Sequence, residues 1–143
     1  MKAYLSRRYR FSASHRLHSE DFTDEENHAV FGKCNNPFGH GHNYVVQVTV
    51  SGQVDPATGM VCDLTKLDAF AHTNLLSHFD HTNLNTLSLF DDLVPTTENL
   101  AIVIHRIFRD FSAACLENVH VEETGNNSFD YAGDQDMTPG SRP

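Results

Sequence analysis

The alternation of side chains between residues 41 and 54 limits the possible folds of this chain more than any other feature. One face of this predicted β-strand is apolar: Tyr44, Val46, Val48 and Val50. The other face is more polar: Val45, Gln47 and Thr49. Because successive side chains of a strand point to opposite faces, the pattern predicts a sheet with one buried face and one more polar face.

Two histidines at the start of this strand point to a metal site. His40 and His42 are two residues apart, so on a strand they face the same side. They can bind one metal ion together, with His15 arriving from a neighbouring strand. Three imidazoles occupy three corners of a tetrahedral zinc site and leave the fourth open, which is typical of catalytic zinc. The remaining histidines, apart from His81, are interpreted as surface or hydrogen-bonded residues: His18, His28, His72, His78, His105 and His120.

The setting of Cys34 favours a reactive thiol. It lies in a Gly-Lys-Cys-Asn-Asn turn, directly after Lys33 and close to the predicted metal. A neighbouring cation and a metal each lower the pKa of a thiol, so we expect thiolate near pH 7. Asp80 and His81 form a second group, in which the carboxylate can fix the tautomer of a histidine that exchanges protons with a thiol. A cation at the end of a helix, followed by a loop, explains this pair equally well.

Glu122 and Glu123 are adjacent on a predicted strand, so at most one of them is buried. A buried carboxylate needs hydrogen-bond donors. A heterocycle with an amino group and a ring N–H would supply two of them side by side. The alternative is that both carboxylates are exposed.

Composition limits the classes of function. The net charge of −9 argues against nucleic-acid binding. No stretch approaches the roughly 20 apolar residues of a membrane span, and the N-terminus lacks the apolar run of a signal peptide. We therefore expect a cytoplasmic protein without nucleic-acid or membrane partners. The first 18 residues nevertheless carry cations and no acid: Lys2, Arg7, Arg8, Arg10 and Arg16. They could bind an anionic substrate, or they could form a solvated strand face.

The order of the predicted elements is β-β-α-α-β-β. The strands are expected at residues 3–14, 41–54, 118–124 and 128–132, and the helices at 64–79 and 98–114. This order predicts an α+β fold with a four-stranded antiparallel sheet and two helices on one face. Residues 1–133 form one domain, and 134–143 form a flexible tail. The two unpaired sheet edges favour a homo-oligomer.

Several runs of residues resemble the 6-pyruvoyl-tetrahydropterin synthase family, in its cysteine-containing form. They occur in the family's order: Phe11-Ser-Ala-Ser-His-Arg-Leu17, Phe31-Gly-Lys-Cys-Asn-Asn-Pro37, Gly39-His-Gly-His-Asn-Tyr44, Asp55-Pro-Ala-Thr-Gly-Met60, Asp80-His81 with Asn83-Leu84, Pro95-Thr-Thr-Glu-Asn99, and Glu123-Thr with Asn126-Asn127. The resemblance covers about residues 8–130. Three positions depart from the family pattern: Phe38, Glu122 and Gly125.

The resemblance implies roles for the candidate residues. Zinc would be bound by three ligands: His15, His40 and His42. Cys34 would act as the base, with Asp80 and His81 as its proton relay from an adjacent subunit. The catalytic set would also include Glu123, as the anchor of the pterin ring.

Further substrate contacts and the assembly follow from the same resemblance. Thr96, Thr97 and Glu98 would assist the anchor, while Lys33 and the N-terminal arginines are candidate phosphate partners. The family's tunnelling fold implies that three subunits close a β-barrel and that two trimers stack as a hexamer, with active sites at subunit interfaces.

The implied reaction is the conversion of 7,8-dihydroneopterin triphosphate to 6-pyruvoyl-tetrahydropterin with elimination of triphosphate, in tetrahydrobiopterin biosynthesis. One Zn²⁺ per subunit is expected, and Mg²⁺ is a candidate companion of the triphosphate. One alternative is a 6-carboxytetrahydropterin synthase-like enzyme, whose motif around the cysteine differs. The other is a zinc-stabilised pterin-binding module without catalysis.

Overall fold

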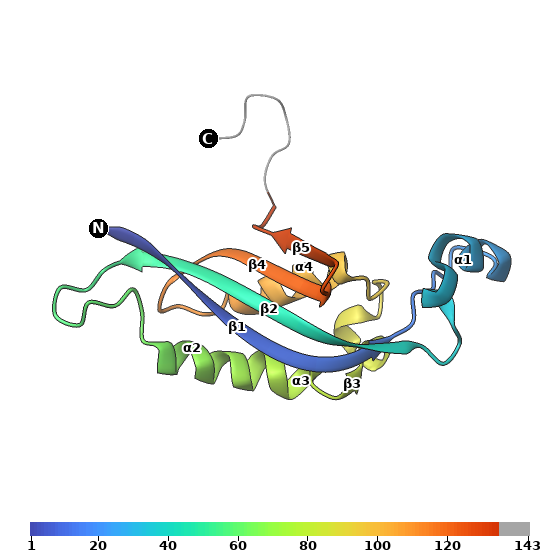
Figure 1. Ribbon diagram of the computed structural model, residues 1–143, viewed down its shortest axis with the longest axis horizontal. Coiled ribbons are helices and arrows are strands. Elements are labelled where there is room, and N and C mark those ends of the chain that lie inside the picture. Colours follow the sequence, from blue (N-terminus) through green and yellow to red (C-terminus); the bar gives the residue numbers. More distant parts are fainter. Residues whose placement is uncertain (135–143) are drawn as a thin grey trace, which may run out of the picture.

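Two long antiparallel strands, β1 (Lys2–His15) and β2 (His40–Gln53), form the centre of the fold (Figure 1). The computed structural model describes residues 1–134. The flexible tail expected at 134–143 therefore lies, apart from Asp134, outside the described residues. β4 (Cys115–Thr124) pairs with β2, and β5 (Asn127–Tyr131) pairs with β4, both antiparallel.

The prediction of four antiparallel strands is wrong in one respect. A short fifth strand, β3 (Thr82–Asn83), pairs with β1 in parallel, so the sheet is mixed and its order is β3-β1-β2-β4-β5. Two residues are too few to produce a recognisable alternation in the sequence, because a strand pattern needs at least four residues. β3 brings the residues that follow the first long helix to the outer edge of β1.

One face of the sheet is covered by helices, as predicted. α2 (Leu64–Ala71) continues through a π-helical turn (His72–Leu76) into α3 (Ser77–Phe79). The predicted helix at 64–79 is thus confirmed, and its expected N-cap, Asp63, accepts a hydrogen bond from the Thr65 N–H at 2.9 Å.

The second covering helix, α4 (Thr97–Phe108), ends before the predicted residue 114. Its chain tightens at the end, where the Phe111 N–H donates to the Phe108 carbonyl at 3.1 Å, and the Phe111 side chain turns into the core. Packing of this aromatic side chain therefore takes precedence over extension of the helix.

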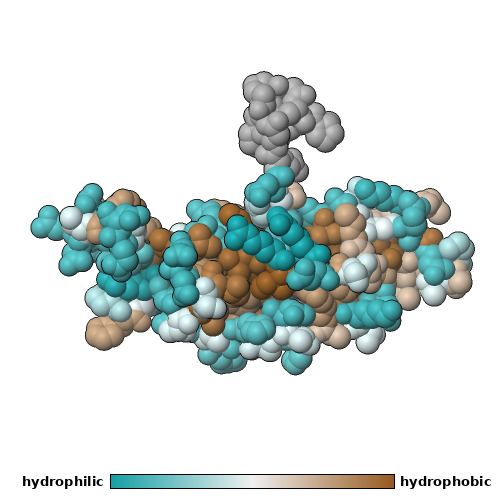
Figure 2. All heavy atoms as spheres, turned by 180° about the vertical axis from the view of Figure 1, so that it is seen from behind, coloured by the Kyte–Doolittle hydropathy of each residue, from teal (hydrophilic) through white to brown (hydrophobic). Residues whose placement is uncertain are grey.

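The core lies between these helices and the apolar face of the sheet. The predicted apolar face of β2 is buried: Tyr44, Val46, Val48 and Val50. Figure 2 shows apolar side chains gathered in the middle of the face seen from behind. No helix of the described residues is both long and apolar enough to span a membrane.

A smaller helical unit lies at one end of the sheet, beyond the last residues of β1 (Figure 1). α1 (Asp24–Phe31) begins with a capping box, in which Thr23 and Glu26 bond each other's backbone N–H groups. A 3₁₀ turn (Gly32–Asn35) follows it and contains Cys34. The Leu17 N–H donates to the Cys34 carbonyl at 2.8 Å, which fastens this turn to the end of β1.

Candidate metal and active site

Three histidine rings converge where β1 ends and β2 begins. The antiparallel register places His15 directly opposite His40, and His42 opposite Ala13. One ring nitrogen from each histidine lies within 4.8 Å of the other two. The predicted arrangement, two histidines on one strand and one on its neighbour, is therefore confirmed.

The protonation pattern of these rings fits a metal ion. The Nδ1 atom of His15 lies 2.8 Å from the Pro95 carbonyl, so Nδ1 donates and Nε2 keeps a free lone pair. That Nε2 lies 3.1 Å from Nε2 of His40. Nε2 of His42 is buried and makes no hydrogen bond among the described residues; its neighbour is the Glu123 carboxylate, at 3.4 Å. Three converging imidazole nitrogens that leave a fourth position open are a donor set that zinc takes in catalytic sites.

Burial keeps two of the ligands in the form that binds metals. It lowers the pKa of His15 and the pKa of His42, because a charged ring is poorly solvated in the interior. Only the neutral imidazole has a lone pair to donate, so this shift favours coordination. His15 is 1% exposed, which places the cluster at the margin of the core.

Glu123 lies beside the histidines, on the core side of β4. Its Oε1 is 3.4 Å from Nε2 of His42, and its Oε2 accepts a hydrogen bond from the Thr97 hydroxyl. Glu122 lies on the opposite face and pairs with Arg8 at 2.9 Å. The prediction that the two adjacent carboxylates face opposite sides is therefore confirmed, with Glu123 as the inner one.

The other predicted substrate residues at the start of α4 have different surroundings. Thr97 is buried against the Glu123 carboxylate, whereas Thr96 is the N-cap and accepts from the Asn99 N–H at 3.2 Å. Glu98 is exposed on the first turn of the helix. Within residues 1–134, Thr97 is thus the member of this trio that hydrogen-bonds the proposed anchor.

Two groups that support His15 were missed in the sequence. The Pro95 carbonyl fixes the orientation of the ring, and the Tyr44 hydroxyl lies 3.3 Å from the same nitrogen. Pro95 is recognisable in the sequence only as a residue that blocks backward extension of a helix. Its carbonyl contact depends on the way the α4 loop packs against β1, and no local pattern indicates that.

Cys34 lines a pocket of about 450 Å³, here called the Cys34 pocket, together with Lys33, Asn36 and the metal-site residue His40. Burial, with a smaller contribution from the Glu123 charge, raises the pKa of the Cys34 thiol. In the chain without a metal, the exposed Lys33 does not offset this effect on the pKa of Cys34. A cation bound by the histidines would lower the pKa of the Cys34 thiol.

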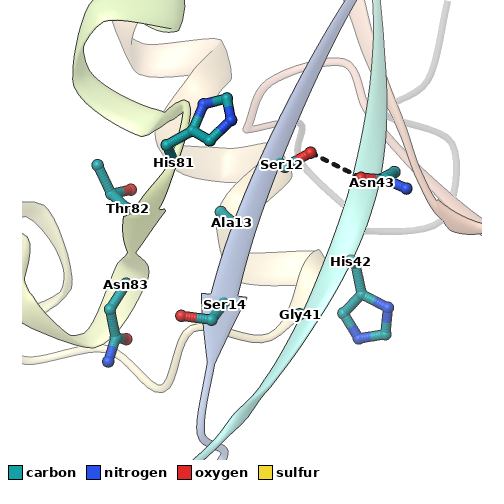
Figure 3. Close-up of a pocket in the computed structure, with 9 residues that line it drawn as sticks. All are labelled: Ser12, Ala13, Ser14, Gly41, His42, Asn43, His81, Thr82 and Asn83. Carbon is teal, nitrogen blue, oxygen red and sulfur yellow. Dashed lines mark hydrogen bonds between the residues drawn. The ribbon is translucent and has the colours of Figure 1, made fainter.

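Asp80 and His81 form a pair at the outer edge of β1. Asp80 Oδ1 accepts from the Ser12 N–H at 2.9 Å and lies 3.0 Å from Nδ1 of His81. His81 has a positive φ of 59°, and its side chain is 83% exposed. It lines the His81 pocket, a hollow of about 470 Å³ shown in Figure 3, with residues of three strands: Ser12, Ala13, Ser14, Gly41, His42, Asn43, Thr82 and Asn83.

Cys34 and His81 line different pockets. In Figure 3 the His81 ring lies beside β1 and the His42 ring beside β2. Within the described residues of one chain, the structure therefore does not bring the predicted base and its predicted relay together.

Fold and site together define a class of protein: an α+β protein with a histidine cluster able to hold a metal. A comparison with protein families narrows this class. The model of the family described as 6-pyruvoyl tetrahydropterin synthase matches residues 4–134, and the chain belongs to this family.

Individual relatives agree with this assignment. The human 6-pyruvoyl tetrahydrobiopterin synthase is 48% identical over 135 residues, which cover 93% of each chain. The solved structure of the Caenorhabditis elegans 6-pyruvoyl tetrahydropterin synthase has a TM-score of 0.90 and 43% identity, and it covers 94% of this chain and 97% of that one. A putative 6-carboxy-5,6,7,8-tetrahydropterin synthase of Archaeoglobus fulgidus is 34% identical over 65% of this chain and 72% of its own length.

Proposed function

We propose that this chain is a zinc-dependent lyase that converts 7,8-dihydroneopterin triphosphate to 6-pyruvoyl-tetrahydropterin and triphosphate, in tetrahydrobiopterin biosynthesis. The observation that carries the proposal is the convergence of the three histidine nitrogens within 4.8 Å of one another, beside the inward carboxylate of Glu123. The names of the close relatives support the choice of reaction.

The zinc ligands would be His15, His40 and His42. Zinc bound there would supply Lewis acidity to polarise substrate hydroxyls and acidify the neighbouring C–H bond. The Pro95 carbonyl keeps the proton of His15 on Nδ1, so that Nε2 stays available for coordination. Mg²⁺ would accompany the triphosphate rather than occupy the histidine site, because it prefers oxygen ligands.

Glu123 would anchor the pterin ring. Its carboxylate can accept two parallel hydrogen bonds, from an amino group and a ring N–H. The side chain is only 17% exposed, and the Thr97 hydroxyl holds one of its oxygens. A carboxylate held in this way orients the substrate before any proton moves, which is the role that the start of α4 would serve.

The Cys34 thiolate would remove the acidified proton of the substrate side chain. His81 would then transfer protons, with Asp80 bonded to its Nδ1 so that Nε2 exchanges the proton. Since His81 lines a pocket apart from that of Cys34, the relay would come from an adjacent subunit. Triphosphate leaves by elimination, and tautomerisation gives the diketo side chain.

The proposed assembly is a homohexamer of two stacked trimers in the cytoplasm. The sheet offers edges for such an assembly, since β1 is paired on its outer side only at Ala13 and Ser14 within the described residues. Long unpaired edges favour association with another chain. Closure of three sheets into a barrel would pair the free backbone N–H and C=O groups of these edges.

One assay tests the function directly. The purified protein is incubated with 7,8-dihydroneopterin triphosphate, with and without a chelator, and the products are identified by mass. We expect triphosphate and 6-pyruvoyl-tetrahydropterin, and loss of both with the chelator. A 6-carboxytetrahydropterin product would favour the alternative reaction. Unfolding on chelation, without turnover beforehand, would favour a binding module.

The role of Cys34 is tested by Cys34→Ala. General acid–base catalysis typically contributes about 10²–10⁴-fold, so kcat should fall by that order while pterin binding persists. Cys62→Ala is the matched control, since this thiol is buried in the core. Normal turnover by Cys34→Ala would contradict the mechanism.

A further inference from the structure

Two of the arginines that were candidates for binding phosphate already form ion pairs with carboxylates of the same chain. Arg7 forms a bidentate ion pair with Asp68, with N–O distances of 3.0 and 2.9 Å, and Arg8 pairs with Glu122 at 2.9 Å. An anion that competed for either guanidinium would have to displace a carboxylate. Arg16 makes no ion pair within the described residues, and it lies directly after a metal-site histidine.

Arg16 is held in place by its surroundings. Its backbone exchanges two hydrogen bonds with the Asn85 side chain, at 2.7 and 2.9 Å. Its Nε donates to the Asn35 carbonyl at 3.1 Å. The two terminal nitrogens have no acceptor within residues 1–134, so the guanidinium is oriented while several N–H groups remain free. A held guanidinium with free N–H groups is suited to phosphate oxygens.

Arg16 lines a pocket of about 440 Å³ between the end of β1, α1 and the 3₁₀ turn. This Arg16 pocket is lined by Arg16, Asp24, His28, Gly32, Lys33, Asn35, Asn36 and Pro37. Two permanent cations, Arg16 and Lys33, outweigh the one carboxylate, Asp24. In a chain with a net charge of −9, such a local excess of positive charge attracts anions.

The Arg16 pocket adjoins the site already described. Lys33 and Asn36 line both the Arg16 pocket and the Cys34 pocket, which also contains His40. A ligand whose reacting carbon lies at Cys34 can therefore extend a charged tail past Lys33. Figure 2 shows that this end of the molecule, around α1, is largely hydrophilic.

We infer that the Arg16 pocket binds the polyphosphate tail of the substrate, with Arg16 and Lys33 as its cations and His28 on its wall. This inference rests on the proposed function for the identity of the tail. It assigns no such role to Arg7 or Arg8, because both already pair with carboxylates of the chain. It also gives His28 a place at the site, although its sequence context suggests an ordinary surface histidine.

Binding of inorganic tripolyphosphate to the full-length, zinc-loaded protein tests the inference, measured by isothermal titration calorimetry. Arg16→Gln should weaken binding at least about tenfold, because charge-assisted bonds are lost. Lys33→Gln, at an exposed position, should weaken it in the same direction. Arg8→Gln removes the same charge elsewhere and should keep the wild-type affinity.

A second ligand separates binding of the tail from general damage. Dihydroneopterin, which has no phosphates, should bind equally well to the wild type and to Arg16→Gln. Equal losses in Arg8→Gln and Arg16→Gln, or no tripolyphosphate binding to the wild type, would overturn the inference. Specific tripolyphosphate binding without turnover of the triphosphate substrate would instead refute the proposed function and leave the pocket assignment standing.

Discussion

At the scale of single residues, Gly39 shows how closely β2 approaches β1 at the metal site. It has a positive φ of 73°, and a Cβ there would lie 2.9 Å from the His15 carbonyl oxygen. No side chain fits between these backbones. Gly39 therefore allows His40 to begin its strand directly opposite His15.

This close approach gives a first prediction. Gly39→Ala should lower the free energy of unfolding by about 1–3 kcal/mol and reduce the zinc content, because the start of β2 must move. Gly59→Ala is the control: Gly59 has nearly the same φ, 72°, and nothing lies within 4 Å of its Cβ position. Gly59→Ala should lower the free energy of unfolding only through backbone strain, and it should keep its full zinc content. Thermal unfolding and metal analysis measure both effects, and equal zinc loss in the two variants would contradict the explanation.

His105 gives a second prediction, on pH. Burial lowers its pKa below the usual value near 6.5, so the unfolded chain binds the proton more tightly than the folded one. The contribution of neutral His105 to the stability of the folded state is therefore complete above about pH 6.5 and is lost as the pH falls below that value. We expect the melting temperature to fall between pH ~7.5 and ~5.5, and to fall less in His105→Gln. An equal fall in both proteins would assign the effect to other groups.

The candidate site was largely predictable from the sequence because its key signal is local. The spacing of His40 and His42 becomes a shared face as soon as the strand forms. The direction of the Cys34 pKa was not predictable in this way. It depends on burial and on Glu123, which lies far along the chain and approaches only through the pairing of β4 with β2.

At the scale of elements, the first residues of α4 serve both the helix and the site. Thr96 caps the helix through its hydroxyl, while Thr97, one residue later, bonds Glu123. Thr96→Ala should cost about 0.5–2 kcal/mol of stability in urea unfolding, with pterin affinity largely kept. Thr97→Val should weaken pterin binding instead, because Glu123 loses its donor. The reverse pattern would show that these adjacent threonines have been given the wrong roles.

The elements themselves were predictable where their patterns were long. The strand at 41–54 and the helix at 64–79 correspond closely to β2 and to α2 through α3. The missed element, β3, has two residues, and its pairing with β1 is decided by the Ser12 contacts of Asp80 and His81. Short elements of this kind depend on tertiary contacts rather than on local sequence.

At the scale of the whole molecule, the separate pockets of Cys34 and His81 give a prediction about assembly. Cys34→Ala and His81→Ala subunits are each expected to be nearly inactive. After unfolding and refolding together, they should regain roughly a quarter of the wild-type sites, since random mixing places an intact Cys34 opposite an intact His81 in one arrangement out of four. Each variant refolded alone is the control. Absence of recovery in mixed oligomers would place both residues in the same subunit's site.

The segment at residues 95–97 has a consequence for how the ligands of this protein influence each other. The Pro95 carbonyl steadies a metal-binding ring, and two residues later Thr97 steadies the carboxylate proposed for the pterin. One short stretch of backbone thus connects two separate ligands. If metal loading orders this stretch and thereby tightens pterin binding by some factor, thermodynamic linkage requires pterin to tighten metal retention by the same factor. At equilibrium, a pterin-saturated sample should then need a higher concentration of a competing chelator to lose its metal than the free protein needs.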